Sequence, residues 1–459
     1  MITPDTLIRC INPATEEEVF RYRAASKDDV KGAVARARRA SQKWKEHSAW
    51  KRSDFLSEAA STIRSRKEEF AKIITQEMGK TIKESVAEVE KCARGVDYYA
   101  ENGPKFLEDE LVQTEAAESY IAFEPLGVIA SIMPWNFPMW QPLRFAAPSL
   151  IAGNSVMLKP SRFVPRSGMM LQEVFEDANL PAGCFQTVAG DSSTGEALLD
   201  ADVDGYSFTG SVDVGVEIGR KAASRLKKCV LELGGSDPFI VLADADVKKT
   251  AKSAVAGKFV NCGQSCIASK RFIVVKDVLD EFVEKFVSNT KRLKVGDPLN
   301  RNTDIGPLVS KEALQKIEAQ LDKAREDGAE VLCGGERHGS RGYFYEPTVL
   351  VNVKEKMQIV NEEVFGPVAP IISAKDEKDA MRIANSTKFG LGASLWTENI
   401  EKAKKIVSQI EAGLVTVNNI VVSDPRIPFG GVKQSGIGRE LSRYGMLEFV
   451  NIKSVRIHE

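Results

Sequence analysis

The chain has 459 residues, a formal net charge of −1, and contents of 43% hydrophobic and 28% charged residues. Such values are ordinary for a globular protein and do not indicate a surface for nucleic acid or anionic membranes. The length predicts two or three lobes. No segment approaches the roughly 18 unbroken apolar residues of a membrane span. The first six residues lack the basic head and apolar stretch of a secretory signal.

Cysteine and histidine usage narrows the chemistry further. The seven cysteines are odd in number and mostly far apart, which predicts reduced thiols and a cytoplasmic location. Cys262 and Cys266 are four residues apart, but no His or Cys pair follows at zinc spacing, so we expect no metal site. The three histidines lie in no recognisable motif. Acid–base chemistry is therefore expected from carboxylates or lysines.

Helices are predicted for the first hundred residues, followed by an α/β block. Apolar stripes at Val34–Trp44 and Leu56–Ile63 have helical spacing, and strand composition follows at 120–123. From about Gly127 the pattern becomes strand, turn, helix, with apolar runs at 128–133, 155–158, 185–188 and 205–208. This alternation predicts a parallel sheet with helices on both faces.

A second α/β block is predicted in the rest of the chain. Its strand-like runs lie at 238–242, 272–275, 368–372 and 414–417. The tail at 450–457 alternates apolar and polar residues, as an edge strand does.

Three turns of the first block are candidates for ligand binding, because ligands of open parallel sheets bind at the carboxyl ends of strands. They lie at 134–138, 159–162 and 208–215. The last turn enters a helix through Gly210 and Gly215, where bare backbone amides can receive a phosphate. The spacing is not G-x-G-x-x-G, and glycines that serve only a tight turn are the alternative.

Cys266 is the candidate nucleophile. A helix-like run at 251–259 ends just before it, and Gly263 then breaks the pattern, so the thiol is expected at a turn. Thiolate is the strongest nucleophile among ordinary side chains. The alternative is a small buried apolar residue, which cysteine often is.

Seven short motifs in order resemble the NAD(P)-dependent aldehyde dehydrogenase superfamily across essentially the whole chain. They are PWNFP at 134–138, KP at 159–160, FTGS at 208–211, LELGG at 231–235, GQSC at 263–266, EEVFGP at 362–367 and PFGGVKQSGIGRE at 428–440. Residues 134–141 and 227–242 are similar to the bacterial-type succinate-semialdehyde dehydrogenases within that superfamily.

The resemblance implies an α/β, aldehyde-dehydrogenase-like fold with three regions. A Rossmann-type NAD(P)-binding domain is expected at 1–106 and 126–234, with part of 431–449. An α/β catalytic domain is expected at 235–430. A small β oligomerisation arm at 107–125 and 450–459 implies a homodimer or homotetramer, and an exposed strand edge that pairs with a second subunit fits this expectation.

The resemblance also implies a mechanism of aldehyde oxidation. Cys266 would attack the aldehyde, forming a thiohemiacetal and then a thioester that water hydrolyses. The Asn136 side chain and the Cys266 backbone N–H would stabilise the oxyanion. Glu232 would be the hydrolytic base, since its apolar neighbours predict a raised pKa. The alternatives are a turn-forming role for Asn136 and a surface position for Glu232.

NADP or NAD is the implied cofactor. Lys159 would bind the adenosine ribose and Ser211 a pyrophosphate oxygen, while Glu363 and Phe365 would hold the nicotinamide ribose and ring. Arg162 stands where NAD-preferring members commonly carry an acidic residue, so we expect NADP to be accepted; a solvent-facing Arg162 is the alternative. The remaining predicted cofactor residues are Trp135, Ser161, Gly210, Gly215 and Leu233.

The substrate implied is succinate semialdehyde, recognised through Arg144. A guanidinium binds a distal carboxylate in a bidentate fashion, and a solvent-facing helical arginine is the alternative, which the apolar neighbours of Arg144 disfavour. Trp140 and Arg426 are further candidates. Oxidation of other short aldehydes such as glyceraldehyde or lactaldehyde stays open. Two further functions also stay open. One is acylation of coenzyme A, which a hydrolytic base disfavours, and the other is a binding role without catalysis. Cys262 is either buried or a disulfide partner of Cys266.

Overall fold

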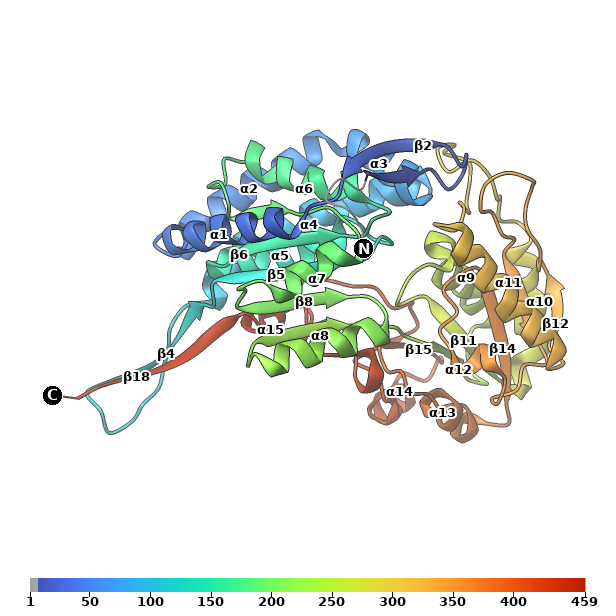
Figure 1. Cartoon of the computed structure of the whole chain (residues 1–459). Coiled ribbons are helices and arrows are strands. Elements are labelled where there is room, and N and C mark those ends of the chain that lie inside the picture. Colours follow the sequence, from blue (N-terminus) through green and yellow to red (C-terminus); the bar gives the residue numbers. More distant parts are fainter. Residues whose placement is uncertain (1–6, 459) are drawn as a thin grey trace.

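The structure, a computed structural model, describes residues 7–458. The first six residues, where the sequence predicts no secretory signal, lie outside this range, as does Glu459. Two α/β lobes lie side by side, and a narrow β arm projects from one of them (Figure 1). Within the described residues, no helix is both long and apolar enough to cross a membrane.

The first lobe is built on a six-stranded sheet with the order β17-β9-β8-β5-β6-β7. Its strands are β5 (Val128–Met133), β6 (Ser155–Pro160), β7 (Phe185–Thr187), β8 (Gly205–Thr209), β9 (Lys228–Glu232) and β17 (Gly436–Ile437). All neighbours are parallel except β17, which is antiparallel to β9. The four strands predicted for this lobe and the parallel arrangement are therefore confirmed.

Helices cover both faces of this sheet (Figure 1). They are α1 (Lys27–Trp44), α2 (Ala49–Ser65), α3 (Lys67–Met78), α4 (Ile82–Phe106), α5 (Trp140–Ala152), α6 (Pro165–Asp177), α7 (Ser192–Asp200) and α8 (Val212–Ser224). Alternate strand residues face opposite sides: Ile129 and Val156 pack into one core, Ala130 and Met157 into another.

The prediction that the first hundred residues are helical is wrong for the N-terminal part. There β1 (Leu7–Ile11) and β2 (Glu18–Arg23) form an antiparallel hairpin. Its strands are short and mostly exposed, so they lack the apolar run of a buried strand. The hairpin turn reaches the second lobe, where Tyr343 donates a backbone hydrogen bond to Pro13.

The second lobe contains a seven-stranded sheet with the order β12-β13-β14-β11-β10-β15-β16. Its strands are β10 (Asp237–Val241), β11 (Ser269–Val275), β12 (Glu330–Cys333), β13 (Thr348–Val351), β14 (Val368–Ala374), β15 (Gly392–Trp396) and β16 (Leu414–Val417). The four predicted strands of this lobe are confirmed, whereas β12, β13 and β15 are additional. Only β12 is antiparallel to its neighbour.

The helices around this second sheet are α9 (Val247–Phe259), α10 (Leu279–Thr290), α11 (Lys311–Glu326), α12 (Gln358–Asn361), α13 (Glu377–Asn385) and α14 (Ile400–Ile406). Short 3-10 turns lie at Val260–Gly263, Lys276–Val278, Val407–Gln409 and Lys433–Ser435.

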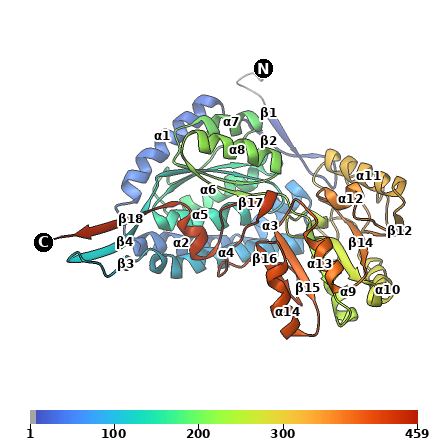
Figure 2. The ribbon, with the colours of Figure 1, turned by 90° about the horizontal axis from the view of Figure 1, so that it is seen from below.

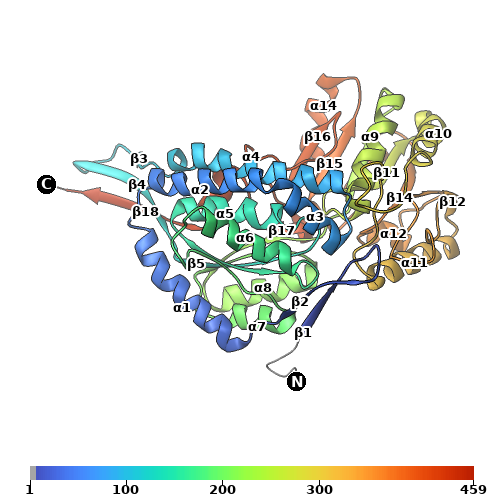
Figure 3. The ribbon, with the colours of Figure 1, turned by 90° about the horizontal axis from the view of Figure 1, so that it is seen from above.

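The arm is a three-stranded antiparallel sheet that extends away from both lobes (Figures 2 and 3). It consists of β3 (Glu110–Leu111), β4 (Glu118–Pro125) and β18 (Val450–Ile457), in the order β18-β4-β3. Helix α15 (Ser442–Leu447) leads into β18. The predicted strands at 120–123 and in the tail are confirmed, and β18 lies at the edge of the sheet.

Candidate active site

A cavity of about 320 Å³ lies between the two lobes. The first lobe contributes the segments that follow β5, β8 and β9, together with the start of α5; the second lobe contributes the turn before β11, helix α11 and the segment before β14. The lining residues are Pro134, Trp135, Asn136, Gln141, Thr209, Gly210, Ser211, Leu233, Gly234, Cys266, Ala313, Lys316, Ile317, Glu363 and Phe365. The cavity therefore lies at the carboxyl ends of the first sheet's strands, as ligand sites in such sheets do.

Cys266 reaches this cavity through a left-handed turn. Helix α9 ends at Phe259, and Asn261, Cys262 and Gly263 then have φ values of 52°, 56° and 73°. A Cβ atom at Gly263 would lie 2.2 Å from the Gly366 carbonyl oxygen, so this position requires glycine. After this turn, Cys266 lines the cavity together with residues of the first lobe.

Two cations oppose the effect of burial on the thiol. Burial raises the pKa of Cys266 to about 11, while Arg144 and Lys270 oppose this rise. The Lys270 ammonium donates to the carbonyl oxygens of Ser265, at 2.9 Å, and Cys266. It also lies 3.4 Å from the Glu363 carboxylate. Lys270 thus links the nucleophile turn to a residue expected to hold the cofactor, and no sequence motif indicated it.

Asn136 lies in the same cavity, with its amide held on both sides. Its Nδ2 donates to the Gln264 carbonyl oxygen at 3.1 Å, and its Oδ1 accepts from Gln141 Nε2 at 3.1 Å. The Asn261 side chain donates to the Asn136 carbonyl at 2.9 Å. These contacts bring Asn136 and Cys266 together and orient the Asn136 amino group as a donor.

Helix α4 holds both of these segments through two glutamates. Glu84 accepts a hydrogen bond from the Asn261 backbone at 2.6 Å. Glu88 accepts from the backbone of Met139 and Trp140, each at 3.0 Å, at the start of α5. Glu88 is buried and paired with Lys80. The sequence shows only that these glutamates lie one helical turn apart, so this function was missed.

Glu232 ends β9 and is 2% exposed. Within residues 7–458, neither of its carboxylate oxygens has a hydrogen-bond partner. Burial raises its pKa well above the usual value, Glu440 adds to the rise, and Arg144 and Arg439 oppose it. The predicted upward shift in the pKa of Glu232 is confirmed. The surface position considered as an alternative is wrong, since the strand end is buried.

The two arginines expected to bind a substrate carboxylate already face carboxylates of this chain. Arg144 is buried, forms an ion pair with Glu440, and donates to the Thr209 hydroxyl at 3.3 Å. Arg426 pairs with Asp424 at 2.6 Å and is largely exposed. The solvent-facing alternative for Arg144 is therefore wrong, because the apolar neighbours bury it beside a carboxylate distant in sequence. Its assignment to the substrate stays a prediction.

Trp140 is also buried. Its indole Nε1 donates to the Ser423 hydroxyl at 3.0 Å. It does not line the cavity that holds Cys266, so its assignment to the substrate stays a prediction.

Six of the predicted cofactor residues line the cavity: Trp135, Gly210, Ser211, Leu233, Glu363 and Phe365. Gly215 packs against the lining residue Leu233: a Cβ atom at Gly215 would lie 2.3 Å from the Leu233 side chain. Ser211 precedes α8, and its hydroxyl makes no capping bond to the described residues of that helix. A bare helix N-terminus beside a glycine suits a phosphate.

Lys159, Ser161 and Arg162 lie at the end of β6, outside the cavity lining. Burial lowers the pKa of Lys159 to about 8, with Asp191 opposing and Arg162 adding to the shift. The Arg162 guanidinium is exposed and lies 4.9 Å from the Phe163 ring centre. These cations and the helix terminus fit a dinucleotide with an additional phosphate.

Cys262 is a free, buried thiol in the core of the second lobe. Burial raises its pKa far above the usual range, and the nearby Lys258 only partly opposes this. This environment supports the inert alternative for Cys262, and a disulfide with Cys266 stays a prediction.

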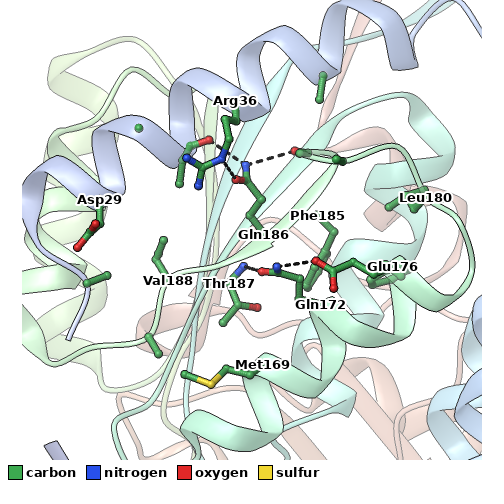
Figure 4. Close-up of a pocket in the computed structure, with 18 of the residues that line it drawn as sticks. Asp29, Arg36, Met169, Gln172, Glu176, Leu180, Phe185, Gln186, Thr187 and Val188 are labelled. Atoms are coloured by element: carbon green, nitrogen blue, oxygen red, sulfur yellow. Dashed lines mark hydrogen bonds between the residues drawn. The ribbon is translucent and has the colours of Figure 1, made fainter. Parts of the chain in front are cut away.

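A larger cavity of about 810 Å³ lies between α1 and α6, at the β7 edge of the first sheet (Figure 4). It contains none of the predicted catalytic residues. Gln172 accepts from the Thr187 backbone at 2.8 Å, and Arg36 donates to Gln186 at 3.0 Å. Because its side chains bond to the edge strand and to one another, we assign this cavity a structural origin.

Comparison with known proteins identifies the group to which this site belongs. The model of the aldehyde dehydrogenase family matches residues 2–455. A succinate-semialdehyde dehydrogenase [NADP(+)] 1 of Mycobacterium tuberculosis is 44% identical over 98% of this chain and 99% of its own length. A probable succinate-semialdehyde dehydrogenase [NADP(+)] of Synechocystis is also 44% identical, with the same coverage. The crystal structure of succinic semialdehyde dehydrogenase from Streptococcus pyogenes with NADP+ superposes with a TM-score of 0.96 at 34% identity, over 98% of this chain and 100% of that one.

Proposed function

The chain belongs to the aldehyde dehydrogenase family, and from this we propose that it oxidises succinate semialdehyde to the carboxylic acid with NADP or NAD. The observation that carries the proposal is the presence of Cys266 and Asn136 in one cavity, next to the segments predicted to bind the cofactor. The 44% identity to NADP-dependent succinate-semialdehyde dehydrogenases over almost the whole chain supports this substrate and cofactor.

In the first step, the Cys266 thiolate attacks the aldehyde carbon to give a thiohemiacetal. The Asn136 amino group and the Cys266 backbone N–H donate to the developing oxyanion. Loss of one such donor typically costs about 10²–10³ in rate. The hydrogen bond from Gln141 to the Asn136 oxygen supports this donor orientation.

A bound NADP or NAD would supply the acceptor for the hydride of the thiohemiacetal carbon. Lys159, Ser161, Arg162 and Ser211 would hold its adenosine and phosphate part, with Arg162 directed at a 2′-phosphate. Trp135, Glu363 and Phe365 would hold the nicotinamide part. The acyl group then remains bound to Cys266 as a thioester.

In the second step, Glu232 takes a proton from water, which attacks the thioester and releases the acid and the Cys266 thiolate. A carboxylate with a raised pKa is a better base near neutral pH than an ordinary one. The absence of any hydrogen-bond partner for its oxygens within the described chain supports this role. The presence of a hydrolytic base also disfavours transfer of the acyl group to coenzyme A, for which no such base is needed.

We also propose that the three regions expected from the sequence are the functional domains, and that the arm joins two subunits in a homodimer or homotetramer in the cytoplasm. Exposed apolar residues on the arm, Leu111, Ile452 and Ile457, support a protein contact there. Light scattering coupled to size-exclusion chromatography tests this assembly; a monomer that persists at micromolar concentration would contradict it.

An absorbance assay of reduced cofactor tests the function. We expect higher kcat/KM for succinate semialdehyde than for glyceraldehyde, lactaldehyde or butanal, and no turnover by Cys266→Ala. A higher value for glyceraldehyde or lactaldehyde would instead support the alternative of a general short-aldehyde oxidase.

A further inference from the structure

Glu77, in the last turn of α3, is a buried carboxylate that the proposed mechanism does not use. It is 2% exposed and makes three short hydrogen bonds, all of them to the start of α6. Its Oε1 accepts from the Arg166 backbone at 2.8 Å, and its Oε2 accepts from the Ser167 backbone and hydroxyl at 2.9 and 2.6 Å. Val164, which precedes α6, makes no side-chain cap. Glu77 thus supplies, from another helix, the acceptor that a helix N-terminus requires.

The start of α6 lies directly against the loop that is expected to bind the adenosine part of the cofactor. A Cβ atom at Gly168, in the first turn of α6, would lie 2.5 Å from the ring of Pro160, which ends β6. Only residues 161–164 separate this strand end from α6. Within them, the Val164 backbone N–H donates to the Ser161 carbonyl oxygen at 3.0 Å. A shift in the first turn of α6 would therefore move this short loop.

A second contact holds the same loop from the N-terminal hairpin. The buried thiol of Cys10, on β1, donates to the Phe163 carbonyl oxygen at 3.2 Å, and its sulfur lies 3.9 Å from Glu77 Oε1. The Phe163 ring in turn lies 4.9 Å from the Arg162 guanidinium. Glu77 and Cys10 thus fix the backbone that follows Arg162, whereas the Arg162 side chain is exposed.

We propose that Glu77 is a positioning residue that holds the loop of Arg162 in place for the 2′-phosphate of NADP. The inference rests on the proposed function, in which Arg162 meets that phosphate and Lys159 the adenosine ribose. Lys159 belongs to β6, and the pairing of this strand with β5 fixes it independently of Glu77. Glu77 should consequently affect the phosphate that only NADP carries, and spare the parts that NADP and NAD share.

Binding of reduced cofactor in the absence of aldehyde, followed by nucleotide fluorescence, tests this role. A pH of about 8 suits the assay, because burial raises the pKa of Glu77 to about 7, although the bonds from Ser167 and Arg166 oppose the rise. In Glu77→Gln, an amide N–H replaces one acceptor and faces the N–H groups of α6. We expect Kd for NADPH to rise about 10-fold, as for loss of a hydrogen bond to a charged group, and Kd for NADH to change less than about threefold.

Glu68→Gln, at an exposed glutamate of the same helix, is the control and should change neither dissociation constant. An equal rise for both cofactors in Glu77→Gln, or no rise for either, would overturn the assignment.

A double-mutant cycle separates positioning of Arg162 from a general effect on the fold. Arg162→Ala should itself raise Kd for NADPH about 10- to 100-fold, since it removes a charged contact to the phosphate. In the Arg162→Ala background, Glu77→Gln should add less than about twofold, because the contact that it positions is already absent. Two effects that multiply in full would show that Glu77 does not act through Arg162.

Ser167→Ala keeps the test decisive if Glu77→Gln does not fold. It removes only the hydroxyl bond to Glu77, so Kd for NADPH should rise about threefold, as for one ordinary hydrogen bond, while Kd for NADH stays unchanged. A folded Ser167→Ala whose ratio of the two constants equals that of the wild type would contradict the assignment.

Failure of this inference and failure of the proposed function are distinguishable, because the binding assay needs no aldehyde. A wild-type enzyme that does not oxidise succinate semialdehyde contradicts the proposed function. A preference for NADPH that survives unchanged in a folded Glu77→Gln contradicts only the role of Glu77. A wild-type enzyme that binds NADPH no more tightly than NADH would overturn the roles of both Arg162 and Glu77.

Discussion

Arg144 and Glu440 form a buried ion pair that acts electrostatically on Glu232. The same arginine opposes the rise in the pKa of both Cys266 and Glu232. Glu440 acts in the opposite direction on Glu232 and has a raised pKa itself because of its burial. In the proposed mechanism, Arg144 therefore supplies positive charge to both half-reactions, whichever aldehyde is bound.

We predict that Arg144→Met lowers kcat for succinate semialdehyde and for butanal alike, by about 10- to 100-fold. The expected reason is that both Cys266 and Glu232 then hold their protons to higher pH, since one unit of pKa is a factor of ten. Loss of one member of a buried pair also costs about 3–5 kcal/mol of stability. The double variant Arg144→Met with Glu440→Gln, which leaves no unpaired charge, is the control. A selective rise in KM for succinate semialdehyde would instead support the predicted role of Arg144 as a substrate clamp.

Glu232→Gln should slow the steady-state rate by about 10²- to 10⁴-fold, the usual contribution of a general base. Formation of the first equivalent of reduced cofactor should be preserved, because only thioester hydrolysis needs this base. Stopped-flow absorbance at an enzyme concentration of about ten micromolar or more separates the burst of reduced cofactor from the steady-state phase. A lost burst, or an unchanged steady-state rate, would disprove this role.

Lys270→Met should raise the pKa of the Cys266 thiol, since one of the two cations that oppose the effect of burial is removed. Less thiolate would then be present at any given pH, so the rate of alkylation by iodoacetamide should be lower and its pH profile shifted upward by about one unit. Lys270→Arg keeps the charge and should restore most of the profile. An unchanged profile in Lys270→Met would mean that this lysine is only structural.

Arg162→Glu should lower kcat/KM for NADP by about 10- to 100-fold while that for NAD stays within about threefold, because a carboxylate repels a 2′-phosphate and hydrogen-bonds ribose hydroxyls. Arg36→Glu, a charge reversal in the cavity at the β7 edge, controls for the change in net charge. A wild-type enzyme that strongly prefers NAD would refute the role of Arg162.

The parts of the fold that could be predicted from sequence are those with a strong local pattern. Strands β5 and β10 consist mainly of apolar residues and are buried along almost their whole length, as expected for strands covered on both faces. Strand β15 was missed because Gly392, Ala393 and Ser394 have low strand propensity; its neighbours β10 and β16 determine its structure.

The residues of the candidate site also fall into those that a local motif predicts and those that it does not. Cys266, Asn136 and Glu232 lie in recognisable motifs, and burial of Glu232 followed from its apolar neighbours. The partners of Arg144 and Lys270 could not be predicted, because Glu440 and Glu363 come from segments far away in the chain. Residue spacing along the chain carries no information on such pairs.

Helix α4 carries the two glutamates that hold the Asn261 turn and the start of α5. Both proposed oxyanion donors, one from each lobe, thus depend on the first two turns of a single helix. Fraying of those turns would release both segments at once, so the oxyanion site opens as one cooperative unit. Turnover should consequently be lost at a lower temperature or denaturant concentration than the one at which the cores of the two sheets unfold.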